Sequence, residues 1–491
     1  MHDTFTFGLL VLSAASATLL AVQSHRLSER LRVPTPAFFL VAAALAVELI
    51  PDLGEPSHRT VERIVTVALL VILFDGGLHI GSARFRSSAG PILSLGVLGT
   101  LFTVVGAAEL VHLLLDTPWY ASVLVATAIA PTDPAVVFSV LGRREIEGRS
   151  GTVLEGESGA NDPVGIALMA ALLTAGSLSA GALVGAAGTF VLQLVVGTVV
   201  GIFGGRLLLV GMRRLPLPAQ GLYPVRTLVG VGVVFGLATV AHGSGFLAVF
   251  VAGIVLGDER APYKRDIERF HAALASLGEV VAFAYLGFTV HLDVLARSDV
   301  WIPGLVIGLA LALLVRPVLV GPLLLRSALS RGERAFVLLS GLKGAVPLLL
   351  GSFLLDAGLP EADRLYAVVV VVVLVSVVLQ GGLVPTLARL FHVRMRTVEQ
   401  EPFSLGIGLR EQPRAAHRVT IEAGSVAAGS QLRLLPGLAE GTWVSLVLRE
   451  GVLVNVRGDT VLLPGDDVLL LVDEDQDPDV VRQLFAGHPQ I

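Results

Sequence analysis

The stretch ATAIAPTDPAVVFSVLG, residues 126–142, contains the feature that decides the fold of this chain. It is apolar enough to cross a membrane, yet Asp133 stands inside it between Pro131 and Pro134. A proline inside a helix costs about 3 kcal/mol, and an aspartate at the centre of a bilayer costs roughly 2.5–3.5 kcal/mol on insertion scales. These costs predict a broken membrane helix whose irregular backbone is buried in protein or lines a cavity, because such backbone is not tolerated against lipid.

The composition around this stretch is that of a polytopic membrane protein. Of the 491 residues, 54% are hydrophobic and 15% are charged, whereas soluble domains average about 25% charged residues. Long apolar runs fill residues 1–392, followed by a charged linker at 393–416 and a small domain of ordinary polarity at 417–486. The chain has no cysteine, which excludes disulfides and thiol-ligated metals. Its net charge of −5 and the lack of a basic arm give no indication of a nucleic-acid partner.

Thirteen candidate spans can be drawn, since a spanning helix needs about 20 apolar residues. They lie near 4–23, 34–50, 60–80, 90–115, 118–142, 157–176, 183–212, 222–241, 244–257, 272–292, 301–325, 333–355 and 364–392. No cation precedes the apolar run in MHDTFTFGLL, which favours a retained first helix over a cleaved signal peptide. Arginine and lysine gather in alternate loops, so the positive-inside rule predicts an outer N-terminus and a cytoplasmic C-terminal domain.

The C-terminal domain is predicted to be a small α+β module. Its short β-branched runs are separated by the turn signals Glu450-Gly451, Gly458-Asp459 and Pro464-Gly465-Asp466. The final segment DPDVVRQLFAG is typical of a closing helix.

The densest group of polar residues in an apolar span is LEGESGANDPVGIALM, residues 154–169. On a helix, residues four apart share a face, which pairs Ser158 with Asp162 and Glu157 with Asn161. The hydroxyl and carboxylate of the first pair are hard oxygen ligands suited to a small cation. The alternative interpretation is an N-terminal cap, since acidic and hydroxyl side chains favour the first turn of a helix.

A second broken span is predicted at LSGLKGAVPLLLG, residues 339–351, where glycines and a proline surround Lys343. Two interrupted spans in the two halves of a transporter indicate an ion site at mid-membrane. The positive N-terminal ends of the half-helices would suit Asp133, and the negative C-terminal ends would suit Lys343. This compensation of helix dipoles is also an alternative role for Asp133, and it is compatible with ion binding.

Arg316 in LLVRPVLVG is predicted to need an acidic partner, because it lies inside an apolar span. Glu157 is the preferred partner, and Glu279 in LGEVVAFAYLGF is the alternative.

Five motifs together resemble the monovalent cation:proton antiporters, a family that includes NhaP-type proteins and animal sodium/proton exchangers. They are TDP (132–134), GESGAND (156–162), RP (316–317), GLKGAVP (341–347) and VVLQGGLVPTLAR (377–389). The match runs in order along residues 1–392, and residues 417–486 resemble the C-terminal lobe of RCK, or TrkA-type, regulatory domains. This combination is similar to the potassium/proton antiporter branch.

The resemblance implies an all-α membrane fold with inverted repeats and two broken crossing helices, plus the α+β cytoplasmic domain. It implies a homodimer with a dimerisation domain and a mobile core. It also implies that Asp162 carries the exchanged ion or proton, that Thr132, Asp133, Ser158 and Asn161 surround it, and that Glu157 pairs with Arg316. In this family an Asn-Asp pair, here Asn161-Asp162, accompanies electroneutral exchange. Relatives usually carry Arg in place of Lys343, and the two cations are not equivalent.

We therefore predict antiport of a monovalent cation, with K+ favoured and Na+ possible, for H+ across the cell membrane, with no enzymatic activity and no resident cofactor. A cation and a proton would exclude each other at Asp162. An RCK-regulated cation channel is the alternative, but it would need a carbonyl-lined filter such as TVGYG, which the sequence lacks. An intramembrane hydrolase is disfavoured, because GESGA departs from G-x-S-x-G and H-E-x-x-H is absent. For the C-terminal domain we expect regulation by a small ligand such as a cyclic dinucleotide.

Overall fold

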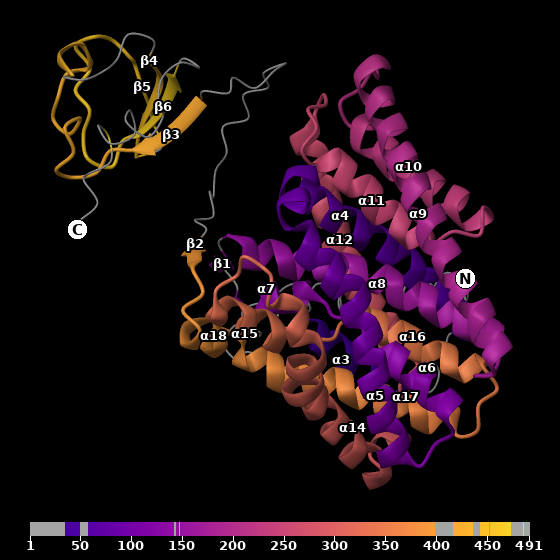
Figure 1. Ribbon diagram of the computed structural model, residues 1–491. Coiled ribbons are helices and arrows are strands. Elements are labelled where there is room, and N and C mark those ends of the chain that lie inside the picture. Colours follow the sequence, from indigo (N-terminus) through magenta and orange to yellow (C-terminus); the bar gives the residue numbers. More distant parts are fainter. Residues whose placement is uncertain are drawn as a thin grey trace, which may run out of the picture. The chain divides into compact units, whose positions relative to one another are not determined.

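The computed structural model describes residues 35–49, 57–141, 144–146, 148–397, 416–435, 442–450, 452–472 and 485. The chain divides into two units, Met1–Gln400 and Glu401–Ile491. The described part of the first unit is almost entirely helical, and that of the second is built on strands (Figure 1). The predicted first span at 4–23 lies outside the described residues, as does the predicted closing helix apart from Phe485.

The α-helices among the described residues of the first unit follow in chain order. They are α3 (Thr35–Leu49), α4 (His58–Leu93), α5 (Thr100–Leu115), α6 (Trp119–Ile129), α7 (Pro134–Leu141), α8 (Arg149–Ala175), α9 (Ala180–Arg214), α10 (Leu222–Val240), α11 (Gly245–Gly257), α12 (Lys264–Gly287), α13 (Leu292–Leu295), α14 (Ser298–Ala310), α15 (Arg331–Leu339), α16 (Ala345–Asp356), α17 (Ala362–Val375) and α18 (Gly381–Leu390). Seven continuous helical runs within the described residues are long and apolar enough to cross a membrane. The predicted polytopic membrane fold is confirmed at this level.

In the described part of this unit, three π-helical segments adjoin α-helices. Ser94–Gly99 joins α4 to α5, Leu311–Val320 follows α14, and Ser376–Gln380 joins α17 to α18. A π-helical turn widens the backbone locally and often marks a functional site. The second segment carries Arg316, and the third follows the valine-rich helix α17.

The two predicted helix breaks are both present. The span expected at 118–142 is two helices, α6 and α7, separated by residues 130–133. The span expected at 333–355 is likewise α15 and α16, separated by residues 340–344. Proline begins α7 and lies in the first turn of α16, where a missing backbone N–H is tolerated.

α8 differs from the prediction, which began this span near residue 157. The helix starts at Arg149, so Glu157 and Ser158 lie in its third turn. The alternative interpretation of these residues as an N-terminal cap is therefore wrong. Polar side chains of these first turns have a partner on α4: Arg84 donates hydrogen bonds to Thr152 Oγ1 at 3.3 Å and to Glu155 Oε2 at 3.1 Å.

Close helix packing surrounds this region. α4 lies against α8, α11 and α12, and Gly77 of α4 faces Gly253 of α11. A methyl group on Gly77 would meet the backbone oxygen of Phe250, so the two helices approach within backbone contact. Small residues at such crossings are typical of helix packing in membranes.

The stretch predicted as a linker, 393–416, contains a short strand. β2 (Met395–Thr397) pairs antiparallel with β1 (Arg144–Ile146), which lies between α7 and α8. A three-residue strand has little pattern of its own, so the sequence of either segment does not predict the pairing.

The second unit contains a four-stranded antiparallel sheet in the order β3-β6-β4-β5. The strands are β3 (Ala416–Thr420), β4 (Thr442–Arg449), β5 (Val452–Val454) and β6 (Asp467–Val472). Glu450 and Gly465, at two of the predicted turns, have φ values of 51° and 88°. Val447, Val468 and Leu470 are fully buried in its core. The strands of the predicted small α+β domain are confirmed.

Candidate ion-binding site

The two helix breaks lie in contact and are joined by hydrogen bonds. The backbone amide of Asp133, in the first break, donates to the carbonyl oxygen of Leu342, in the second, at 2.7 Å. Lys343 Nζ donates to the carbonyl oxygen of Ala130 at 2.9 Å. Two segments more than two hundred residues apart thus satisfy each other's backbone groups, which is the requirement for non-helical backbone at membrane depth.

The charged side chain in each break, Asp133 in the first and Lys343 in the second, lies at a helix end of opposite polarity. Asp133 Oδ1 accepts a hydrogen bond from the Ala135 amide at 2.8 Å, at the N-terminus of α7. The Lys343 ammonium contacts Ala130, which ends α6. Both placements follow the prediction from helix dipoles. Gly344 is required by close approach, because a methyl group there would overlap the Asp133 carboxylate.

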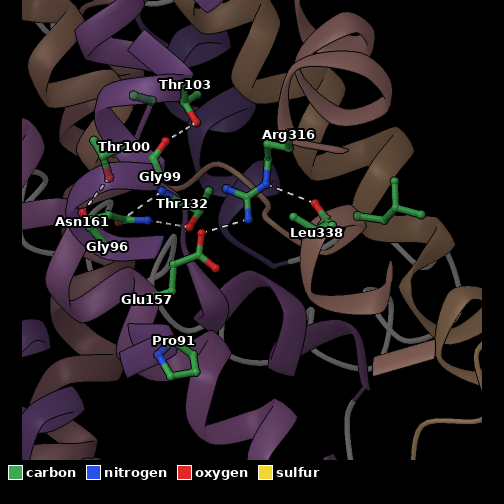
Figure 2. A network of polar contacts seen from close by, with 12 residues as sticks. Pro91, Gly96, Gly99, Thr100, Thr103, Thr132, Glu157, Asn161, Arg316 and Leu338 are labelled. Atoms are coloured by element: carbon green, nitrogen blue, oxygen red, sulfur yellow. Dashed lines mark hydrogen bonds and ion pairs between the residues drawn. The ribbon is translucent and has the colours of Figure 1, made fainter. Parts of the chain in front are cut away.

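α8 presents its buried polar face to the first break. Asn161 Nδ2 donates to Thr132 Oγ1 at 2.7 Å, and the Thr132 amide donates to Asn161 Oδ1 at 3.3 Å (Figure 2). Ser158 and Asp162 are 4% and 9% exposed. The structure therefore brings Thr132 and Asn161 into direct contact and buries Ser158 and Asp162 on the same helix.

Asp162 follows directly on the residue of α8 that contacts the first break, because Asn161 donates to Thr132, which precedes Asp133. Lys343 of the second break donates to Ala130 of the first break. Charged residues of both signs thus belong to α8 and to the two breaks that these hydrogen bonds join. An anionic site that is only partly compensated by one ammonium can accept a further cation or a proton.

Lys343 is held by two residues that the sequence analysis did not identify. Its backbone amide donates to Ser376 Oγ at 3.0 Å, and Ser376 Oγ donates to Gln380 Oε1 at 2.9 Å. Gln380 Nε2 in turn donates to the carbonyl oxygen of Leu339, at the end of α15, at 2.7 Å. Gln380 lies within the motif VVLQGGLVPTLAR. Its polar amide side chain in an apolar span could have identified it as a candidate functional residue.

Arg316 and Glu157 form a buried ion pair, as the sequence predicts. Arg316 Nη2 and Glu157 Oε1 are 2.8 Å apart, and each side chain is 3% exposed. Arg316 Nε also donates to the carbonyl oxygen of Leu338 at 3.0 Å (Figure 2). The pair connects α8 to the π-helical segment and to α15. Glu279, the alternative partner, is not the acid that binds Arg316.

The chemistry of the site is that of hard oxygen donors. Hydroxyls of Thr132 and Ser158 and the carboxylates of Asp133 and Asp162 belong to one region of the fold. Within the part of the chain that the structure describes, no three His, Asp or Glu side chains form a cluster that could hold a metal ion. Alkali cations bind weakly through oxygen ligands of this kind, whereas transition metals prefer nitrogen and sulfur.

Comparison with known proteins agrees with this geometry. The family profile described as "Sodium/hydrogen exchanger, transmembrane" matches residues 12–390. The chain belongs to that family. It is therefore a multi-pass membrane protein of the monovalent cation:proton antiporters, and the resemblance found in the sequence is confirmed.

Similar proteins support the same assignment. The antiporter is 31% identical over 501 residues to the K(+)/H(+) antiporter NhaP2 of Shewanella oneidensis, covering 99% of this chain and 85% of that protein. It is 32% identical over 380 residues to the K(+)/H(+) antiporter NhaP of Alkalimonas amylolytica, covering 76% and 65%. The sodium proton antiporter MjNhaP1 from Methanocaldococcus jannaschii has the same fold, with a TM-score of 0.64 at 22% identity over 78% of this chain and 100% of that chain.

Proposed function

We propose that the antiporter exchanges a monovalent cation for H+ at Asp162, with K+ favoured over Na+. The observation that carries this proposal is the burial of Asp162 on α8, next to Asn161, which bonds to the first of two helix breaks that are themselves joined by hydrogen bonds. The two breaks contribute one carboxylate, Asp133, and one ammonium group, Lys343. The preference for K+ rests on the relatives that are named K(+)/H(+) antiporters.

Exchange follows from competition at one carboxylate. A buried carboxylate is stable when it is protonated or when a cation faces it, and it is costly when it is charged and alone. The hydroxyls of Ser158 and Thr132, with Asp133, would complete the shell of a dehydrated cation. If the site changes sides only when it is occupied, cation and proton move in opposite directions.

One charge per cycle would make the exchange electroneutral. Asn161 is neutral and is engaged with Thr132 through both its amide oxygen and its amide nitrogen. Asp162 then alternates between one cation and one proton, and the cycle moves no net charge. A sustained substrate-induced current on a solid-supported membrane would contradict this stoichiometry, as would exchange driven by a valinomycin-imposed potential in a sodium-containing assay.

Proteoliposomes test the exchange itself. A pH dye is quenched by an acidic lumen, and K+ or Na+ is then added outside in turn. Dequenching by either cation supports antiport, and a lower half-saturating concentration of K+ supports the assignment of K+. The absence of dequenching by both cations in sealed, correctly inserted vesicles would refute the proposed function.

The arrangement in the membrane is also part of the proposal. We place about thirteen spans in the bilayer, the N-terminus outside, the C-terminal domain in the cytoplasm, and two copies in a homodimer. Arginine-rich alternate loops support this orientation. Labelling of single cysteines is feasible because the chain has none of its own. A cysteine introduced at Arg457 should react with an impermeant maleimide only in inside-out vesicles.

The C-terminal domain is proposed to be an RCK-like regulatory lobe. It has no transport chemistry, so it would bias the membrane domain between states by binding a small ligand such as a cyclic dinucleotide. The alternative is a module for folding or assembly. Truncation at residue 400 separates these roles, because regulation predicts a stable membrane domain with a changed rate or pH profile. An unchanged profile, with no cytosolic small molecule affecting the full chain, would refute regulation.

A further inference from the structure

The second helix break opens one hydrogen bond that a continuous helix would contain. In an α-helix each amide donates to the carbonyl oxygen four residues earlier, so the Lys343 amide would donate to Leu339. In the break, the Lys343 amide donates instead to Ser376 Oγ at 3.0 Å. The Leu339 carbonyl oxygen accepts from Gln380 Nε2 at 2.7 Å. Both groups of the opened bond therefore have side-chain partners on the π-helical segment Ser376–Gln380.

The two side chains on this segment are also bonded to each other. Ser376 Oγ accepts from the Lys343 amide and donates its own proton to Gln380 Oε1 at 2.9 Å. Gln380 thus accepts from Ser376 with its oxygen and donates to Leu339 with its nitrogen. A hydroxyl and a carboxamide suit these positions, because each can donate and accept at the same time. The resulting bridge runs from the Lys343 amide to the Leu339 carbonyl, in the direction of the helical bond that it replaces.

A π-helical turn presents both side chains to the break. Ser376 and Gln380 begin and end this segment, and the Gly381 amide after it donates to the carbonyl oxygen of Ser376, five residues earlier. A serine inside a helix can donate back to a carbonyl oxygen of the preceding turn. Ser376 is 4% exposed and donates to Gln380 instead, so its hydroxyl is engaged with the break and not with its own backbone.

The bridged part of the second break is also the part that contacts the first break. The Leu342 carbonyl oxygen accepts from the Asp133 amide at 2.7 Å, and Lys343 Nζ donates to the Ala130 carbonyl oxygen at 2.9 Å. If Leu339 and Lys343 closed their helical bond, the residues between them would form a helical turn. The carbonyl oxygens of such a turn point along the helix axis. Leu342 would then no longer accept from Asp133, and the two breaks would lose this contact.

We propose that Ser376 and Gln380 are positioning residues of the ion site, whose side chains hold the second break open and so keep Leu342 and Lys343 against the first break. This inference rests on the proposed function and assigns the residues that maintain its geometry. The bridge consists of neutral groups, so it adds no proton to the cycle and is compatible with electroneutral exchange.

Hydrogen exchange of the first break tests the positioning without transport. Two of residues 130–135 are prolines, so the few amides of this stretch include that of Asp133, which Leu342 protects. In the purified full-length protein in detergent, these amides should exchange about tenfold faster in Gln380→Met than in the wild type, through the loss of hydrogen bonds. Gln193→Met is the matched control, because Gln193 is a half-buried amide on α9, which packs against α8, α10 and α11.

Methionine is preferred to alanine at position 380. A cavity of about 10 Å³ is already lined by Gln380, Ser376, Lys343 and Gly341. Truncation would enlarge this cavity, and a polar cavity of sufficient size can admit a water molecule that replaces the lost amide. Methionine fills a similar volume but cannot donate to Leu339.

Two substitutions of Ser376 separate hydrogen bonding from packing. Ser376→Thr keeps the hydroxyl, whereas Ser376→Val has the same shape as threonine without it. Ser376→Thr should therefore resemble the wild type in the hydrogen exchange of residues 130–135 and in cation-dependent proton flux in proteoliposomes. Ser376→Val should show the faster hydrogen exchange and a proton flux about tenfold lower, as Gln380→Met should.

The outcomes distinguish this inference from the proposed function. Impairment of Gln380→Met and Ser376→Val, with Gln193→Met and Ser376→Thr like the wild type, supports the positioning role. Equal hydrogen exchange in Ser376→Thr and Ser376→Val, or unchanged proton flux in Ser376→Val, would overturn it. A wild type without cation-dependent flux would instead overturn the proposed function, while the hydrogen exchange still decides whether the bridge holds the breaks together. If Gln380→Met does not fold, the two Ser376 variants decide the result.

Discussion

Breaking the Arg316–Glu157 pair should destabilise the membrane domain more than any exposed pair of the described residues. The two side chains are 3% exposed and their charged atoms are 2.8 Å apart. Removal of one partner of such a buried pair typically costs about 3–5 kcal/mol, because the other charge remains without compensation. Arg316→Met also removes the hydrogen bond to Leu338, worth about 0.5–1.5 kcal/mol. We therefore expect the loss of unfolding free energy to lie near the upper end of this range for Arg316→Met and near its lower end for Glu157→Gln.

The double variant distinguishes pairing from bulk packing. Glu157→Gln together with Arg316→Met leaves no unpaired charge, so its loss of unfolding free energy should be well below the sum of the two single losses. Unfolding would be followed in detergent at constant pH. Arg213→Met is the matched control, since Arg213 and Glu259 are 2.7 Å apart but 45% and 43% exposed. Its cost should be about 0–1 kcal/mol. Additive single losses, with no coupling between positions 157 and 316, would refute the reasoning.

Two further changes test the contact between the two helix breaks and the C-terminal domain. Gly344→Ala should reduce exchange strongly, because its methyl group would overlap the Asp133 carboxylate. Gly236→Ala is the control, because the added methyl group meets open space in α10. It should leave exchange unchanged and stabilise the helix by up to about 1 kcal/mol. In the C-terminal domain, the bidentate hydrogen bond from Arg449 holds the pKa of Asp466 below its usual range. Its stabilisation is thus present above the unfolded pKa of about 3.9 and is lost as pH falls through the lower folded value. Arg449→Met should raise the rate of amide hydrogen exchange in β4 and β6 of the full-length protein at pH 7. The difference in rate from the wild type should shrink towards pH 3. A difference that is independent of pH would contradict this prediction.

The helix breaks and the buried ion pair were predictable because their residues conflict with their surroundings. Proline, glycine and charged side chains are costly in an apolar span, so Asp133, Lys343 and Arg316 stand out without any structure. The pairing of Arg316 with Glu157 followed from the need of a buried cation for an acid, although the sequence also offered Glu279.

Other features depend on backbone and tertiary contacts that carry no signature in the sequence. The hydrogen bond from Asp133 to Leu342 involves only main-chain atoms, so no side chain signals it. The polar first turns of α8 are partnered by Arg84, which lies on another helix. The support of Lys343 by Ser376 arises where the backbone adopts a π-helical turn, which an even run of valines does not predict. Tertiary contacts decide these features, and local propensity does not.

Cation-dependent proton flux through Asp162→Asn tests the central claim most directly. The variant keeps the shape of the side chain and removes the charge at which cation and proton are proposed to compete, so it should fold and insert as the wild type does. Asp356→Asn, which changes an exposed acid at the end of α16, serves as the control in the same proteoliposome assay. The account predicts full exchange in the control and none above empty vesicles in Asp162→Asn. Exchange by Asp162→Asn at a rate comparable to that of Asp356→Asn would contradict it.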